Sequence, residues 1–178
     1  MSSTGTPVVP GVGVGVVITP APLPTVPADE PVGPDPAETT AAFERSAARV
    51  ADRLAQRASQ ATGSAAEVLS ATASLARDRG LAALVGKHAP GAGPATATTA
   101  AVEELVTMFT AAGGLMAERV TDLRDVRDRV VADLLDRPEP GIVPPTEPSV
   151  LFADDLAPAD TAGLDPALVV AIAVRLGG

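Results

Sequence analysis

The sequence predicts an α/β unit that is interrupted by a helical insertion. Strand-like apolar segments lie near both ends of the 178-residue chain, amphipathic helical patterns fill the middle, and no internal repeat divides it. Two sequential domains would instead keep the strands together. The expected parts are residues 1–34 (first strand and Pro-rich connector), 35–137 (helical subdomain) and 138–178 (returning, incomplete α/β part).

Composition and charge exclude several classes of function. The chain has no Cys, Trp or Tyr, three Phe, one His and a net charge of −9 at pH 7. Without thiols, disulfide scaffolds and Cys-ligated metal sites are excluded. Acidic charge and scarce aromatic rings argue against nucleic-acid binding. A Ser-His-Asp hydrolase would need His88, in a Gly/Pro-rich segment that indicates a loop.

The sequence gives no sign of export or of membrane insertion. The first basic residue is Arg45, so the cationic region of a secretory signal is missing. No apolar run approaches the roughly 20 residues that cross a bilayer. We therefore expect a cytoplasmic protein that does not associate with membranes.

The first expected strand is the valine-rich stretch 8–18. Its glycines at 11, 13 and 15 alternate with β-branched residues, which suits a strand that another backbone approaches closely. A phosphate loop is not favoured, because the GxGxxG and GK[ST] spacings are absent and prolines, not a helix, follow. Seven prolines between positions 20 and 36 predict an extended connector.

Four helices are expected, forming an antiparallel bundle. The first begins at Asp35, a suitable N-cap, with Pro36 in the first helical position. The second begins with a capping box at Ser64 and ends near Gly80, the third stops at the Gly pair 113–114, and the fourth spans about 115–135.

All four helices are expected to be amphipathic. On the fourth, Asp125 and Arg129 are four residues apart and should pair on the exposed side, which contributes a few tenths of a kcal/mol. The charge run 124–129 is either a solvated helix surface or an electrostatic docking surface. The stripes expected to be buried are Phe43, Ala47, Val50 and Leu54 on the first helix and Met116, Val120, Leu123, Val130 and Leu134 on the fourth; arginines 45, 49, 53 and 57 form a solvated stripe.

After residue 138, prolines break the helical pattern and two further strands are expected. Residues 150–153 indicate a short buried strand, and the apolar run 169–174 indicates a strand buried on both faces. Between them, Asp160 and Thr161 belong to a brief helical turn after Pro158. The pair Asp154 and Asp155 resembles a divalent-metal pair, but adjacent residues of an extended chain point in opposite directions, which favours loop solvation or capping.

Two segments, Met116–Val130 and Ala153–Leu164, resemble consecutive signatures of enzyme I of the bacterial phosphotransferase sugar-uptake system, the phosphoenolpyruvate–protein phosphotransferase. The specific blocks are Glu-Arg-x-x-Asp-Leu-Arg-Asp and Ala-Asp-Asp-Leu-x-Pro-x-Asp-Thr-Ala. The opening Gly5–Val12 is similar to the first strand of that family, and residues 69–78 stand where its docking helix lies. The resemblance implies a swivelling α/β phosphohistidine domain with a helical subdomain inserted near its start.

The resemblance also implies a reaction and a partner. In the family, a histidine takes the phosphoryl group from phosphoenolpyruvate and passes it to the phosphocarrier protein HPr, which docks on the helical subdomain. That histidine follows a Gly pair, so it would follow Gly178 here, and no catalytic residue is expected within the chain. Many members carry a His where this sequence has Thr72. By position, Glu67, Leu69, Leu75, Asp78 and Arg124 are implied to face HPr, and the Thr161 hydroxyl is implied to neighbour the active histidine.

We therefore expect an N-terminal portion of a phosphotransferase that keeps HPr docking and is inactive alone. No metal or cofactor is expected in this chain; the resemblance places Mg²⁺, phosphoenolpyruvate binding and the homodimer contact in the C-terminal part of the intact enzyme. Two alternatives remain open. The chain could be a complete, non-catalytic HPr-binding module, or an unrelated Ala-rich helical interaction protein.

Overall fold

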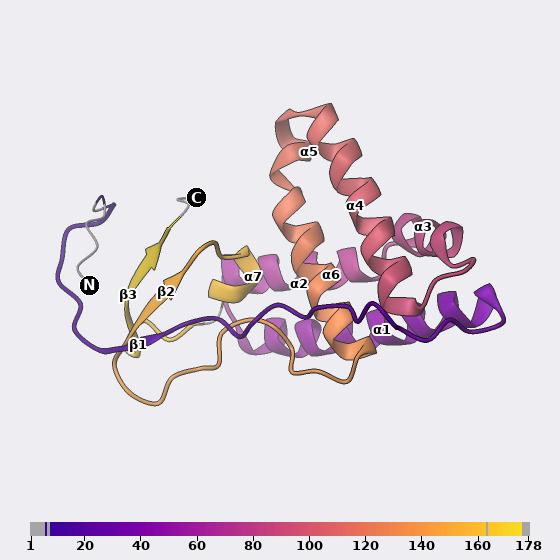
Figure 1. Ribbon diagram of the computed structural model, residues 1–178. Helices are drawn as coiled ribbons and strands as arrows, with labels where there is room; N and C mark the ends of the chain where they lie inside the picture. Colours follow the sequence, from indigo (N-terminus) through magenta and orange to yellow (C-terminus); the bar gives the residue numbers. More distant parts are fainter. Residues whose placement is uncertain (1–5, 7, 163, 176–178) are drawn as a thin grey trace.

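The computed structural model describes residues 6, 8–162 and 164–175. As expected, strands from opposite ends of the chain pair with one another. Strands β1 (Val16–Ile18), β2 (Ser149–Ala153) and β3 (Val169–Val174) form a parallel sheet in the order β1-β2-β3. Figure 1 shows this small sheet beside a larger group of helices. Because parallel strands cannot be joined by a tight turn, the helical segment forms the crossover from β1 to β2.

Strand β1 is much shorter than the predicted strand over residues 8–18. Residues 8–15 are exposed and form no regular strand, and only three residues pair with β2. The close approach predicted at the glycines does occur. A Cβ atom at Gly15 would collide with the carbonyl of Pro148, and one at Gly13 would lie 2.8 Å from the Cβ of Ala171. The glycine pattern thus indicates close packing, but repeated glycines weaken a long strand entropically.

Strands β2 and β3 form where they were predicted. Leu151 and Ala153 of β2 are buried, as expected for the central strand. The prediction that β3 is buried on both faces is wrong: Val169 is buried, but Ile172 is 48 % exposed. Among the described residues β3 pairs with β2 alone, so it is an edge strand. A continuous apolar run therefore predicts a strand correctly but not its depth.

Six helices, rather than four, lie between residues 36 and 134. The helices α1 and α2 form one hairpin, and Figure 1 shows it lying across a second hairpin formed by α4 and α6. The expected antiparallel bundle is thus replaced by two hairpins packed crosswise. The helices are α1 (Pro36–Gln60), α2 (Ser64–Ala76), α3 (Arg79–His88), α4 (Pro94–Ala112), α5 (Gly114–Glu118) and α6 (Val120–Leu134); the turn expected after Pro158 is α7 (Pro158–Thr161).

The additional helix α3 arises because Asp78 caps a new helix. Its carboxylate accepts a hydrogen bond from the Leu81 amide at 2.9 Å, which stabilises the first turn of α3. The prediction that Gly80 ends the preceding helix is therefore wrong, since Gly80 lies inside α3. His88 is the last residue of α3 rather than part of a loop.

The other helix ends agree only partly with the predictions. Asp35 caps α1, accepting a hydrogen bond from the Ala37 amide at 2.8 Å, as predicted. The prediction of a capping box at Ser64 is wrong, because Gly63 is the N-cap residue and no side chain accepts a hydrogen bond there. Gly113 ends α4 as predicted, with φ of 68°. The expected fourth helix is divided at Arg119 into α5 and α6.

The hydrophobic core lies between the two hairpins. The predicted stripe of α1 is confirmed, and each of its members is at most 3 % exposed. Several alanines belong to this core, and its larger side chains come from several helices. The core includes Phe43, Val50, Leu54, Leu69, Leu81, Val85, Val102, Leu123, Val126 and Val130. Among the described residues, no helix is both long and apolar enough to cross a membrane.

The Pro-rich connector is held against the helices by Glu30. The N-terminus of α4 has Gly93 as N-cap and no side-chain cap of its own. The Glu30 carboxylate supplies the missing acceptor from a distance of 65 residues: it accepts from the Ala95 amide at 2.8 Å, the Thr96 amide at 2.8 Å and the Thr96 hydroxyl at 2.6 Å. A negative charge at a helix N-terminus is also favoured by the helix dipole.

Replacing Glu30 by Ala is expected to lower the free energy of unfolding by about 1–2 kcal/mol, because the first amides of α4 lose their acceptor. Urea denaturation at neutral pH measures the change. Asp29→Ala is the matched control, since Asp29 is exposed in the same connector and its side chain makes no hydrogen bond among the described residues. It should change stability by less than about 0.5 kcal/mol. Equal losses in the two variants would contradict the capping role.

Candidate functional site

A cavity of about 520 Å³ lies where the first two strands of the sheet end. Thr19 follows β1 and Asp154 follows β2, and both line the cavity. The carboxyl ends of parallel strands are the edge at which α/β proteins bind ligands. The facing wall is α6, and the remaining lining comes from residues 20–23, 140–141, 152–157 and 160.

Arg124 is the exposed arginine on the α6 wall of this cavity. It makes no ion pair or side-chain hydrogen bond within the described part of the chain. Arg127, one turn further on, is instead held by Glu103 at 2.5 Å and Asp128 at 2.8 Å. The guanidinium of Arg124 therefore keeps all its N–H donors, whose planar fork matches a phosphoryl or carboxylate group.

The carboxylates of the two aspartates after β2 bind other groups of the same chain. Asp154 pairs with Arg175 at 2.6 Å, and Asp155 accepts a hydrogen bond from the Leu156 amide at 2.9 Å. This agrees with the interpretation of these residues as loop groups. Across the residues that the structure describes, no three His, Asp or Glu side chains are grouped to hold a metal ion.

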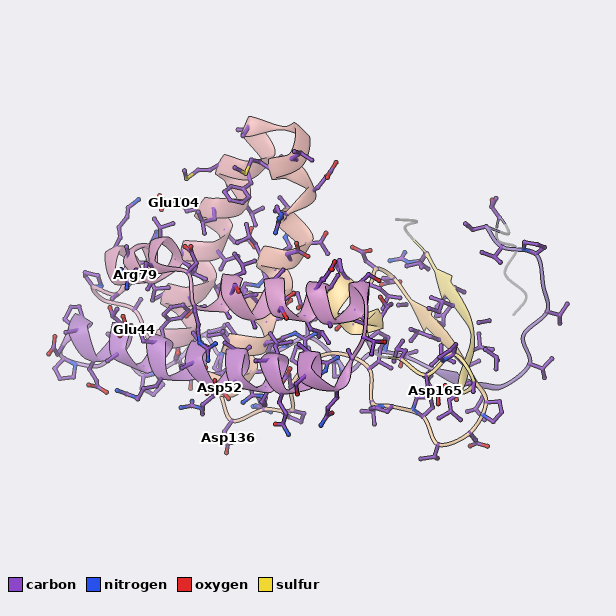
Figure 2. The ribbon with its side chains drawn as sticks, turned by 180° about the vertical axis from the view of Figure 1, so that it is seen from behind. Glu44, Asp52, Arg79, Glu104, Asp136 and Asp165 are labelled. Carbon is purple, nitrogen blue, oxygen red and sulfur yellow. The ribbon has the colours of Figure 1, made fainter. Side chains whose placement is uncertain are left out.

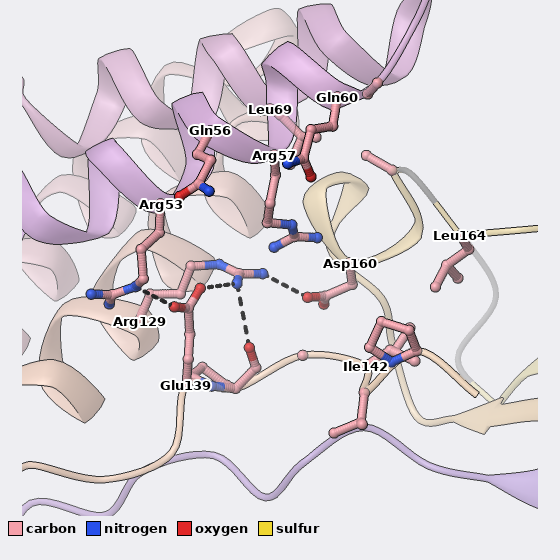
Figure 3. A pocket seen from close by; sticks show the side chains of 16 residues that line it. Arg53, Gln56, Arg57, Gln60, Leu69, Arg129, Glu139, Ile142, Asp160 and Leu164 are labelled. Carbon is pink, nitrogen blue, oxygen red and sulfur yellow. Dashed lines mark hydrogen bonds and ion pairs between the residues drawn. The ribbon is translucent and has the colours of Figure 1, made fainter. Parts of the chain in front are cut away.

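A buried arginine, Arg129, adjoins the cavity and is 1 % exposed. Figure 3 shows its guanidinium between Glu139 and Asp160. Nη1 donates to Glu139 at 2.6 Å, Nη2 to Asp160 at 2.7 Å, and Nε to both oxygens of Asp125 at 2.9 and 3.0 Å. These carboxylates belong to α6, the returning segment and α7. The cluster, here called the Arg129 cluster, therefore ties the helices to the α/β part.

The prediction that Asp125 and Arg129 pair on the exposed side of the helix is right about the pair but wrong about its exposure. The two residues do pair, but Asp125 is 9 % exposed and Arg129 less still. The groups that cover them come from Glu139 and Asp160, which are 10 and 31 residues beyond Arg129. A helical-periodicity argument considers one helix alone, so it cannot detect this covering.

Gly141 allows the returning segment to pass close to the cluster. Its φ is 122°, a conformation that L side chains rarely adopt. A Cβ atom there would lie 3.1 Å from an Asp160 carboxylate oxygen and 3.7 Å from the Arg129 guanidinium. Both conformation and space therefore favour glycine at this point.

Burial and charge shift the pKa values of the cluster in definite directions. Burial raises the pKa of Asp125, and the hydrogen bonds from Arg129 offset this only in part. Burial alone would lower the pKa of Arg129, but the hydrogen bonds to Asp125 and Glu139 and the charges of Asp125 and Asp160 outweigh it and raise that pKa. Arg129 therefore stays charged among three carboxyl groups.

The arginine stripe of α1, predicted to be solvated, is exposed at Arg45 and Arg49. Its C-terminal half is partly buried instead, and Arg53 reaches Glu139 of the returning segment. Asp133 is bound by Arg49 at 2.5 Å, by Arg53 at 3.0 Å and by the Ser46 hydroxyl at 2.8 Å. Arg53 also binds Glu139 at 2.7 Å, which links this group to the Arg129 cluster. Helix α1 carries other exposed charges, among them Glu44 and Asp52, which are labelled in Figure 2.

Asp133 should make stability depend on acidity. Burial would raise its pKa, but the hydrogen bonds from Arg49, Ser46 and Arg53 outweigh burial and lower it. Because the folded pKa lies below the unfolded one, Asp133 stabilises the fold above about pH 4, and this contribution disappears as the pH falls through the folded pKa. Asp133→Asn should cost about 1–2 kcal/mol at neutral pH and almost nothing in strong acid.

Denaturation of both proteins between about pH 7 and pH 2 tests this dependence. Asp136→Asn is the control: Asp136 is exposed, its φ of 52° suits Asn, and its side chain has no hydrogen bond among the described residues. A cost for Asp133→Asn that does not change with pH would contradict the assignment.

The structure exposes most of the residues implied to face HPr, with one exception. Leu69 is 1 % exposed and belongs to the core, so the prediction that it faces a partner is wrong. Thr72 is buried too, and its hydroxyl donates to the Val68 carbonyl at 3.0 Å. Contact by the other residues stays a prediction: Glu67, Asp78 and Arg124 are exposed, and Leu75 is half-buried.

An apolar patch at the α4–α5 end of the second hairpin was missed by the sequence interpretation. Met108 is 55 %, Leu115 80 % and Met116 50 % exposed. Met116 was predicted to be buried, which is wrong. Figure 1 shows α5 at the tip of the hairpin. Neighbouring exposed apolar side chains indicate an interaction surface, and Leu-Met directly after a Gly pair is the sequence signal that could have revealed it.

Thr161 lies at the C-terminal end of α7. Its hydroxyl donates to the Pro158 carbonyl at 3.2 Å, while the adjacent Asp160 lines the cavity. Gly178, after which the family's histidine is implied, lies outside the described residues, so the role of Thr161 stays a prediction. The only histidine of the sequence, His88, pairs with Glu104 at 2.8 Å on the helical part and does not line this cavity.

Sequence comparison places these features in a family. The family model described as PEP-utilising enzyme, N-terminal, matches residues 4–119. Phosphoenolpyruvate-protein phosphotransferase of Streptomyces coelicolor is 44 % identical over 130 residues, which are 72 % of this chain and 23 % of that protein. The protein of the same name from Haloferax volcanii is 45 % identical over 75 residues, 42 % of this chain and 13 % of that one. The chain thus spans less than a quarter of these relatives.

Two solved structures share the fold. An NMR solution structure of Enzyme I (nEIt) has a TM-score of 0.74 at 24 % identity, covering 95 % of this chain and 71 % of that one. The N-terminal domain of Enzyme 1 - Nitrogen has a TM-score of 0.61 at 23 % identity, covering 95 % and 72 %. Since the family match covers more than half of the sequence, the chain belongs to the PEP-utilising enzyme, N-terminal family, in agreement with its resemblance to enzyme I.

Proposed function

We propose that this chain is the phosphocarrier-docking part of a phosphoenolpyruvate–protein phosphotransferase. A small phosphocarrier of the HPr type binds across α2 and α6 and brings its phosphoryl-accepting group to the cavity at the ends of β1 and β2. The family match and the similarity to phosphotransferases of that name support the partner class. Helix α2 packs against both α6 and α7, so the proposed surface adjoins the segment that carries Thr161.

The observation that carries the proposal is the unpaired Arg124 on the α6 wall of the cavity. A phosphoryl group in transit needs positioning and charge neutralisation more than covalent chemistry from the protein. Among the described residues, the guanidinium of Arg124 is free for this, while the neighbouring Arg127 and Arg129 bind carboxylates. Arg124 is thus the basic group that a bound phosphoryl can recruit.

Charge and apolar surface favour a transient protein partner. The net charge of −9 attracts a carrier with a basic rim and speeds encounter at low salt. The exposed Leu115 and Met116 supply the apolar centre that such interfaces contain. Glu67 and Asp78 on the α2–α3 side offer carboxylates to the basic rim.

Phosphoryl transfer itself is proposed for the whole enzyme. His88 is engaged by Glu104 and does not line the cavity, so it is not the acceptor. By resemblance, the active histidine, phosphoenolpyruvate binding with Mg²⁺, homodimer formation and the role in cytoplasmic sugar uptake belong to the intact protein. In that protein, Thr161 would hold the histidine next to the docked carrier.

Calorimetric titration of this chain with purified HPr tests the docking function. We expect one carrier per chain, a Kd in the micromolar range typical of transient complexes, and weaker binding as salt rises. Incubation with phosphoenolpyruvate, Mg²⁺ and HPr should leave both proteins unlabelled. Absence of binding at about 1 mM carrier would refute docking, and acid-labile phosphate on this chain would refute the restriction to docking.

A further inference from the structure

We propose that a second cavity, of about 630 Å³, binds a small organic anion that has a carboxylate or phosphate group and an apolar body. The cavity lies between the C-terminal half of α1 and residues 139–144 of the returning segment. Arg129, Glu139 and Asp160 form its base, so it adjoins the Arg129 cluster. The inference does not depend on phosphocarrier docking.

One wall is a polar face of α1. Arg53, Gln56, Arg57 and Gln60 line the cavity, and their spacing of three, four and seven residues puts them on the same side of the helix. Figure 3 shows all four side chains directed from α1 towards Glu139 and Asp160. This face therefore presents two guanidinium groups and two amides to a single space.

Arg57 is the arginine of this cavity that keeps N–H donors available for a ligand. Arg53 is bound to Asp133 and Glu139, and Arg129 to three carboxylates. Arg57 donates to the Ala159 carbonyl at 3.1 Å and makes no ion pair among the residues that the structure describes. Because a guanidinium has five N–H donors, most of those of Arg57 remain for a ligand.

Within the described part of the chain, Arg57 also carries the uncompensated charge of the cavity. The other two lining arginines are neutralised by carboxylates, including Asp133 and Asp125 outside the lining. A guanidinium without a carboxylate partner favours an anion. The position of Arg57 in the last turn of α1 also stabilises the helix dipole, but this alone requires neither a cavity nor a polar face of four residues.

The opposite wall is apolar and determines the kind of anion. Ile142, Val143 and Leu164 line it, and Figure 3 shows Ile142 and Leu164 across the cavity from α1. A volume of this size suits an organic molecule, and pockets for such ligands combine an apolar lining with a few polar anchors. An inorganic ion would satisfy Arg57 but leave the apolar wall unused.

Titration of the full chain with benzoate, phenyl phosphate and inorganic phosphate tests the proposal. NMR signals of the Arg57 side chain and of the Ile142 and Leu164 methyl groups report on the two walls. We expect at least one aromatic anion to shift both sets of signals saturably, and to bind at least about tenfold more tightly than inorganic phosphate. Whether benzoate or phenyl phosphate binds more tightly identifies the head group.

Two variants identify the anchor and the wall. Arg57→Gln should weaken the aromatic anion at least about tenfold. Arg45→Gln is its matched control, since Arg45 lies on the same helix, is exposed and pairs with Glu38 at 2.7 Å; it should leave affinity unchanged. Ile142→Ser should remove the preference over inorganic phosphate, and it keeps the proposal testable if Arg57→Gln does not fold.

The proposal is overturned if no probe shifts the cavity signals at about 10 mM, or if Arg57→Gln folds and binds like the unmodified chain. Phosphocarrier titration of the folded Arg57→Gln variant separates the two sites. Unchanged carrier affinity with lost anion binding supports a separate site. Loss of both would show that Arg57 acts through the docking surface and would overturn the separate cavity site.

Discussion

Replacing Arg129 by Met should lower the free energy of unfolding by about 3–5 kcal/mol, the cost of removing one partner from a buried ion pair. Met keeps most of the side-chain volume, so the loss is not that of a large cavity. It leaves Asp125 and Asp160 without their cation, and Glu139 with Arg53 alone. The returning segment and α7 then lose their ionic connection to α6.

The loss should depend on pH in a specific direction. Without Arg129, burial holds the folded-state pKa of Asp125 above its unfolded value, with no hydrogen bond from Arg129 to offset it. A raised carboxyl pKa contributes stability that is lost as the pH rises through it. The deficit of Arg129→Met should therefore shrink as the pH falls below 7 and Asp125 takes up a proton.

Chemical denaturation of three variants tests this result. Arg129→Lys should fall between the unmodified chain and Arg129→Met, since Lys keeps the charge but lacks the fork that reaches three carboxylates. Arg137→Met is the control, because Arg137 is exposed and its side chain is unpaired within the described range; it should change stability by less than about 0.5 kcal/mol. A loss below about 1 kcal/mol for Arg129→Met would show that the cluster does not hold the two parts together.

Replacing Arg124 by Glu should weaken phosphocarrier binding at least about thirtyfold, or 2 kcal/mol, because it removes the free guanidinium and adds a carboxylate to an acidic wall. Stability should change by less than about 0.5 kcal/mol, since Arg124 is exposed and unpaired in the described structure. This separation of binding from folding distinguishes Arg124 from Arg129.

Calorimetry with HPr measures the effect. Arg124→Lys should lose a smaller factor, because it keeps the charge without the bidentate fork. Arg137→Glu makes the same change of charge beyond the far end of α6, and because the carrier's rim is basic it should leave binding unchanged, or slightly stronger at low salt. Similar losses for the two Glu variants at physiological salt would exclude a direct contact by Arg124.

Local chemistry in the sequence predicted the elements that depend on neighbouring residues. Asp35 and Pro36 placed the start of α1, and the spacing of Phe43, Val50 and Leu54 gave its buried face. The turn after Pro158 and the strands near residues 150 and 170 were also predicted. In each of these cases, the decisive contacts or torsion preferences lie within a few residues.

Features that depend on distant contacts were not predictable in this way. Arg129 looks like any exposed helix charge until Glu139 and Asp160 cover it. Glu30 has no visible role until the connector meets α4. The exposure of β3 depends on which strands pair with it, and an apolar run gives no information about that.

The family resemblance predicted which helices carry the docking residues but not whether each of those residues is buried or exposed. Motif position placed Leu69 and Arg124 together among the docking residues. The structure leaves Arg124 exposed on the cavity wall and puts Leu69 in the core, since helix α2 turns that side chain towards α1. A motif fixes sequence position, whereas exposure is decided by the packing of the two hairpins.

Amide chemical-shift mapping of this chain during titration with HPr most directly tests the central claim that α2, α5 and α6 form a phosphocarrier surface beside the strand ends. We expect the largest changes at Glu67, Leu75, Met116 and Arg124, and none at Gln56 or Ile142. Changes centred on the cavity at Arg57, or no change at saturating carrier, would contradict it.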